Sequence, residues 1–124
     1  MQPSEAHEQM ALFQWAEWSV GKYPELALMF HIPNGGSRNV KEAANLKRQG
    51  VKAGVPDVFL PVARGNFHGL FIELKRATGG RVSVDQKKML IALRDQGYEA
   101  VVCHGFEDAA NVIQNYLEGG KQDA

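Results

Sequence analysis

Apolar and polar positions follow a pattern that predicts eight elements, in the order helix, strand, helix, strand, strand, helix, strand and helix. Short apolar runs bounded by glycine or proline predict the strands, and apolar residues three or four positions apart predict the helices. The predicted ranges are 4–20, 26–32, 38–50, 55–62, 69–75, 83–96, 100–103 and 106–117. A short connection predicts an antiparallel hairpin between the two middle strands, and the helix that follows can return the chain to a parallel strand. We therefore expect an α/β sandwich with a central mixed sheet.

The first predicted helix has acidic residues on its apolar side. Counting back from Leu12 by four and then three positions puts Glu8 and Glu5 on the stripe that continues through Trp15 and Ser19. The pattern therefore predicts two acids that point inward near the start of this helix. The large aromatic residues are expected in the core: Trp15, Trp18, Phe59 and Phe71.

The composition is typical of a globular domain. Of the 124 residues, 44% are hydrophobic and 23% are charged, which argues against a disordered, collagen-like or coiled-coil chain. We expect one domain over 1–124, with its core at about 5–117 and a frayed tail at 118–124. The single cysteine, Cys103, permits no intramolecular disulfide, and no apolar run approaches the ~20 residues that cross a bilayer. These features lead us to expect a cytoplasmic protein without a membrane partner.

Charge is balanced over the whole chain but not along it. The 14 basic and 14 acidic residues cancel, yet residues 31–88 hold eleven basic and only four acidic residues. This basic middle region is suited to contacts with a phosphodiester backbone, although a solvated helix face would have the same composition. The candidate DNA contacts are Arg38, Lys47, Arg48, Lys52, Arg76 and Arg81.

Three ionisable residues interrupt the predicted hairpin strands. Asp57 follows Pro56 at the start of one strand, and Glu73 and Lys75 share a face of the next because they are two positions apart. Hairpin pairing can bring Asp57 beside them. Burying three such groups costs free energy unless they are paired or bind a metal, so the arrangement indicates a functional site.

The residue types fit hydrolysis of a phosphodiester. Two carboxylates and the backbone carbonyl of Leu74 are the hard oxygen ligands that Mg²⁺ prefers, and Glu8 could complete the coordination or bind a second ion. Lys75 would stabilise the charge on the phosphate or orient the attacking water. The alternatives without catalysis are a solvated ion pair on an edge strand and a structural domain with a buried ion pair.

At these residues the sequence resembles the PD-(D/E)XK nuclease superfamily and, more specifically, its VRR-NUC family. The resemblance rests on GluGln at 8 and 9, HIPNGGSR at 31–38, LKRQGVKAGVPDVFLP at 46–61, GLFIELK at 69–75 and SVDQ at 83–86. It implies a restriction-endonuclease-like αβββαβ fold and a DNA endonuclease dependent on Mg²⁺ or Mn²⁺. In that family pattern, Asp57 and Glu73 bind the metal, Lys75 is the catalytic lysine, Glu8 is the helix-borne acid and Gln86 is an active-site residue.

Stand-alone members of this family resemble Holliday junction resolvases, which act as homodimers on four-way junctions. The resemblance therefore implies a homodimer that cleaves branched DNA. A DNA-binding or recruitment module that keeps the fold without catalysis is the alternative. Two further predictions stay open: His31 faces the metal site or caps the sheet edge, and residues 34–37 form a phosphate-binding nest or an ordinary turn.

Overall fold

The fold was analysed in a computed structural model that describes residues 2–33 and 39–119. Along the chain, the helices and strands are α1 (Glu5–Ser19), the 3-10 helix η1 (Pro24–Leu28), β1 (Phe30–His31), α2 (Val40–Arg48), β2 (Val58–Leu60), β3 (Leu70–Lys75), α3 (Val84–Asp95), β4 (Glu99–His104) and α4 (Phe106–Gly119). The predicted αβββαβ core is present, with α2 inserted between its first two strands.

The four strands form one mixed sheet in the order β1-β2-β3-β4. The β1–β2 and β2–β3 pairs are antiparallel and the β3–β4 pair is parallel, so the predicted hairpin and helical crossover are confirmed. Within the hairpin, Val58 lies opposite Ile72 and Phe59 opposite Phe71. This register decides which side chains meet at the end of the sheet.

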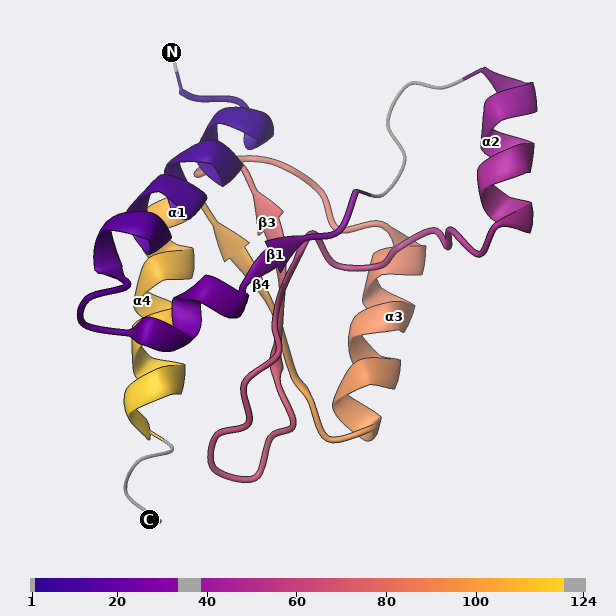
Figure 1. Ribbon diagram of the computed structural model, residues 1–124. Coiled ribbons are helices and arrows are strands. Elements are labelled where there is room, and N and C mark those ends of the chain that lie inside the picture. Colours follow the sequence, from indigo (N-terminus) through magenta and orange to yellow (C-terminus); the bar gives the residue numbers. More distant parts are fainter. Residues whose placement is uncertain (1, 34–38, 120–124) are drawn as a thin grey trace.

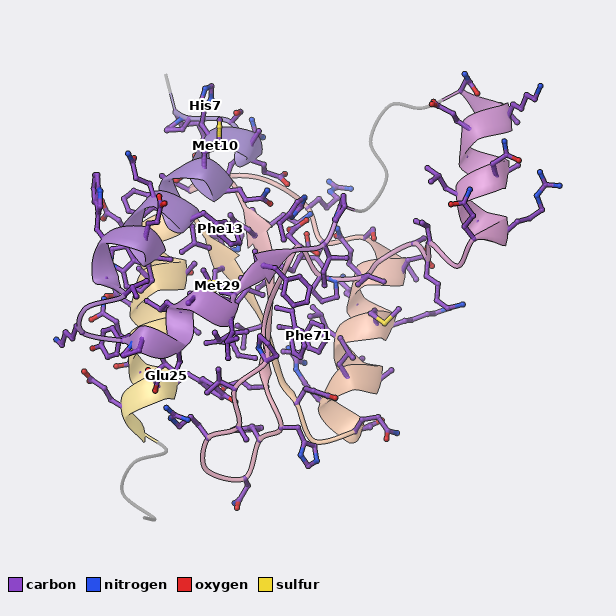
Figure 2. All side chains as sticks on the ribbon, in the orientation of Figure 1. His7, Met10, Phe13, Glu25, Met29 and Phe71 are labelled. Atoms are coloured by element: carbon purple, nitrogen blue, oxygen red, sulfur yellow. The ribbon has the colours of Figure 1, made fainter. Side chains whose placement is uncertain are left out.

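Helices α1 and α4 cover one face of the sheet, and α3 lies on the other (Figure 1). The main core fills the first of these layers: Leu12 of α1, Ile72 and Leu74 of β3, and Ile113 and Leu117 of α4 are all buried. Because side chains alternate along a strand, the β3 residues that alternate with Ile72 and Leu74 project toward α3 instead. Phe71 is one of them, and Figure 2 labels it between the sheet and α3.

The predicted strand over 26–32 is wrong for most of its length. Pro24 begins the 3-10 helix η1, which turns Leu26 into the core, and only Phe30 and His31 pair with β2. The predicted strand over 55–62 shortens to β2 because proline flanks it on both sides and has no N–H for a ladder bond.

Two predictions of inward-facing residues in α1 are also wrong. Trp18 is 76% exposed. It lies two positions after the buried Ala16, and residues two positions apart point to nearly opposite sides of a helix. Glu5 is exposed in the opening turn, so Glu8 is the inward acid of this helix.

The C-terminal helix is longer than predicted. Residues 118 and 119 belong to α4, where Glu118 accepts a hydrogen bond from the Tyr23 hydroxyl. The rest of the predicted tail, 120–124, lies outside the described residues. None of the helices in 2–33 or 39–119 is long and apolar enough to cross a membrane.

Helix α2 stands apart from the sheet and from the other helices (Figure 1). None of its residues is buried, and its cap is local, since the Asn39 side chain accepts a hydrogen bond from Glu42 N. The core therefore does not depend on packing of α2.

Candidate active site

Asp57, Glu73, Lys75 and Gln86 meet where β2 begins, β3 ends and α3 starts. Each element supplies its side chain for a separate local reason. Glu73 and Lys75 share a face of β3 because they are two residues apart, and that face is the one covered by α3.

Asp57 reaches the site through the hairpin register. The Val58–Ile72 pair places Asp57 opposite Glu73 in the next row, and residues opposite one another in an antiparallel pair share a face. Its Oδ2 accepts a hydrogen bond from Leu74 N at 2.8 Å. Because the N–H and C=O of one strand residue point to the same side, the Leu74 carbonyl also faces Asp57.

Glu73 and Lys75 are both buried, with 2% and 6% exposure. Their side chains form an ion pair with 3.5 Å between Lys75 Nζ and Glu73 Oε2. Burial and the neighbouring Asp57 carboxylate raise the pKa of Glu73 to about 8, and Lys75 only partly opposes them. Below about pH 8, Glu73 therefore keeps a proton beside Asp57 in the metal-free protein.

Gln86 connects this ion pair to the start of α3. Its Nε2 donates to Glu73 Oε2 and its Oε1 accepts from Lys75 Nζ, each at 3.1 Å. The same Oε1 accepts from Ser83 N at 2.8 Å, and Ser83 Oγ accepts from Gln86 N, which completes a capping box. Gln86 therefore fixes two site residues while it is itself fixed by the helix start.

The cluster fits a divalent cation. Among the described residues, Glu73 Oε1 is buried and accepts no hydrogen bond, and the carboxylate of Asp57 beside Glu73 is itself an acceptor. A cation between Asp57 and Glu73 would satisfy that oxygen and relieve the repulsion that raises the pKa of Glu73. The oxygens available are two carboxylates and a backbone carbonyl, the donor type that Mg²⁺ and Mn²⁺ accept.

Glu8 makes its hydrogen bond with α4. It is buried, and its Oε1 accepts a hydrogen bond from Phe106 N at 3.1 Å, at the first turn of α4. A carboxylate there satisfies a helix amide and interacts favourably with the helix dipole. Across 2–33 and 39–119, no three His, Cys, Asp or Glu side chains are placed to share one cation. In this structure, Glu8 of α1 therefore caps the start of α4, whereas the site residue Gln86 lies at the start of α3.

Three of the predicted DNA contacts are near site residues along the chain. Arg76 follows Lys75 directly, Arg81 lies just before α3, and Lys52 is in the segment that leads to Asp57; all three are exposed. Lys47 and Arg48 are exposed farther out on α2. Arg38 and the predicted nest at 34–37 lie outside the described residues.

His31 lies at the sheet edge beside the backbone of Asp57. Its Nδ1 lies 2.8 Å from the carbonyl oxygen of Asp57, so the ring is bonded to the backbone at the sheet edge.

Two residues that support the site were not identified from the sequence. Ser83 had a visible signal, because Ser-x-x-Gln before a helix is typical of a capping box. For Gly54, the one sequence signal was its position shortly before Pro56 and Asp57. Its close contact with the start of α3 depends on the tertiary fold.

Comparisons with known proteins agree with the geometry. The family model of the VRR-NUC domain matches residues 5–107. A solved structure described as a VRR_NUC domain protein is similar over 97% of this chain and 93% of its own, with 34% sequence identity and a TM-score of 0.84. No curated protein matches the sequence.

Proposed function

This chain belongs to the VRR-NUC family of nuclease-fold domains, and we propose that it is a metal-dependent endonuclease that hydrolyses DNA. The observation that carries the proposal is the buried Asp57–Glu73–Lys75 cluster with its orphaned carboxylate oxygen. A structural ion pair would need only one acid for the lysine. The second carboxylate raises the cost of the site and has a use when a cation is bound.

In this proposal, Asp57, Glu73 and the Leu74 carbonyl hold Mg²⁺ or Mn²⁺. When bound, the metal polarises the scissile phosphate and lowers the pKa of a coordinated water. The ammonium group of Lys75 supplies positive charge beside the phosphate, where negative charge increases in the transition state. Gln86 holds that ammonium group in place through Oε1 and holds Glu73 through Nε2.

Exposed basic residues near the cluster would bind the DNA backbone. Arg76, Arg81 and Lys52 lie closest along the chain, and Lys47 and Arg48 would contact the duplex farther out. We further propose that the substrate is branched DNA and that two copies of the chain act together. The Asp57–Glu73–Lys75 cluster forms one site on this 13.7 kDa chain, and a second copy would supply a second such site for the opposing strand of a junction.

The test compares cleavage of a mobile four-way junction with that of a matched linear duplex, in Mg²⁺, Mn²⁺ and EDTA. We expect cutting of the junction with either metal and none in EDTA. Asp57→Asn and Lys75→Met should each reduce the cleavage rate at least about 100-fold while junction binding in EDTA persists. Glu107→Gln, an exposed acid in α4, is the matched control and should cut as wild type does.

Two outcomes would contradict the proposal. Junction binding without cleavage in any divalent metal would identify a recruitment module instead. A chain that sediments as a monomer when bound to the junction, yet cuts both strands, would exclude the paired mechanism while leaving the nuclease activity in place.

A further inference from the structure

Gly54 makes an unusually close contact with the start of α3. It lies three residues before Asp57 and has a positive φ of +86°. A Cβ built on this residue would lie 2.5 Å from Asp85 O, 2.6 Å from Asp85 C and 2.9 Å from Gln86 N. All three are backbone atoms of the first turn of α3, so no flexible side chain could move aside to make room.

This contact joins two parts of the site that the sheet does not connect. The hairpin ladder fixes Asp57 relative to Glu73 and Lys75, but Gln86 belongs to α3. Gly54 is on the segment that leads to Asp57, and it lies close against the backbone of the turn that carries Gln86. The absence of a side chain at residue 54 thus sets how near Gln86 lies to its two partners.

We propose that Gly54 is a positioning residue for the proposed nuclease reaction, and that it acts through Gln86 on Lys75 and Glu73. The inference rests on the proposed function of the same site. Gly54 touches neither the phosphate nor the metal. Its role is to let the Asp57 segment pack directly on α3, so that all four site residues have one fixed arrangement.

The size of the effect follows from the distances. Ordinary van der Waals contact begins at 3.4 Å, so a Cβ at 2.5 Å from Asp85 O would displace the turn by about 0.9 Å. The two hydrogen bonds that join Gln86 to Lys75 and Glu73 are 3.1 Å long, and a displacement of this size away from the two partners would stretch them to about 4 Å, beyond hydrogen-bond range. Misplacement by about 1 Å in an active site can reduce a rate about 100-fold.

The experiment uses Gly54→Ala, with Gly50→Ala as its matched control. Gly50 also has a positive φ, +104°, but nothing lies within 4 Å of its built Cβ. Both variants therefore carry the same kind of backbone strain, and only Gly54→Ala adds the clash. We expect Gly54→Ala to lower the single-turnover rate of junction cleavage about 100-fold and to weaken Mn²⁺ binding in calorimetry. Gly50→Ala should match wild type in both measurements.

A double-mutant cycle separates positioning from general damage. If Gly54 acts through Gln86, adding Gly54→Ala to Gln86→Ala should reduce the rate by less than about threefold further. The proposal would be overturned if the rate loss of the double variant equalled the product of the losses of the two single variants. Equal cleavage rates and Mn²⁺ affinities for Gly54→Ala and Gly50→Ala would overturn it as well. If the wild-type chain neither binds Mn²⁺ nor cuts DNA, the proposed function fails instead.

Ser83 provides a second route if Gly54→Ala does not fold. Ser83→Ala removes the hydroxyl that caps Gln86 N, and Ser83→Thr keeps it. We expect Ser83→Ala to lower cleavage and Mn²⁺ affinity several-fold and Ser83→Thr to restore both. Wild-type cleavage by Ser83→Ala would show that the start of α3 does not control the site, and would overturn the inference.

Discussion

Glu73 makes the stability of the metal-free protein depend on pH in an unusual direction. Its carboxylate is 2% exposed and lies beside Asp57, and these two causes raise its pKa from 4.5 to about 8. The folded protein therefore binds this proton more tightly than the unfolded chain does. Stability from this group is present below about pH 4.5 and is lost as the pH rises toward 8.

The size of this loss is large for a single residue. Each pH unit between the unfolded and folded pKa values costs up to about 1.4 kcal/mol of unfolding free energy. Over the window from 4.5 to about 8, the free energy of unfolding should fall by a few kcal/mol. That is a large share of the roughly 5–15 kcal/mol that stabilises a typical domain.

Glu73→Gln removes the titration while keeping the shape of the side chain. The new amide oxygen can accept from Gln86 Nε2, and its NH₂ can donate to the carboxylate of Asp57. We expect the variant to be more stable than wild type at pH 7.5 in EDTA and to lose this advantage toward pH 4.5. Glu107→Gln, an exposed acid outside the site, is the control and should follow the wild-type curve.

The assay is urea unfolding in EDTA at several pH values between 4.5 and 8, followed by the same series in Mg²⁺. A cation at 100 times its dissociation constant should stabilise wild type by about 2.7 kcal/mol, and should stabilise Glu73→Gln much less. Parallel pH curves for wild type and Glu73→Gln would refute the reasoning, since they would show that Glu73 does not titrate in this range.

Three further substitutions test other parts of the structure. The double variant Lys47→Ala/Arg48→Ala should leave urea unfolding unchanged, because no residue of α2 is buried. It should weaken junction binding, and the slope of log K against log salt concentration should fall in magnitude by about 0.9 for each phosphate that is no longer neutralised. An unchanged slope would show that α2 is not part of the DNA interface. Glu8→Ala should destabilise the fold by about 1 kcal/mol, because Phe106 N then has no side-chain acceptor, and should leave the cleavage rate within a few-fold of wild type. Glu5→Ala, at an exposed position of the same helix, is the control. A drop of about 100-fold in the cleavage rate would show that Glu8 takes part in catalysis. Ile113→Ala, fully buried in α4, should cost about 2–5 kcal/mol in urea unfolding, and a smaller cost would mean that the core relaxes around it.

Much of the fold could be predicted from local pattern. Ser83 and Gly97 bracket α3, and the apolar run over 69–75 is β3 within one residue. The errors occur where tertiary contacts override pattern. Apolar residues around Leu26 and Met29 predict a strand, yet they reach the core from a 3-10 turn because only Phe30 and His31 have a partner strand.

The site was predictable in part for the same reason. Alternation along β3 is a local property, so Glu73 and Lys75 could be placed on one face from their spacing, and the hairpin brought Asp57 opposite them. Glu8 illustrates the limit. Helical phase predicted correctly that it is buried, but phase does not say which element it meets, and it meets the amide of Phe106, ninety-eight residues away.

By itself, the sequence determined the order of the main elements, the mixed sheet and the identity of the residues at the end of the hairpin, because these follow from short-range periodicity and turn chemistry. Only the tertiary structure decided how those residues act on one another. It placed Gln86 of α3 beside Glu73 and Lys75, left one carboxylate oxygen without a hydrogen-bond donor, and gave Glu8 a hydrogen bond with the first turn of α4. The physical reason is that burial, hydrogen bonding and pKa depend on atoms a few ångströms away in space, and Gly54 and Gln86 become neighbours only when the chain folds.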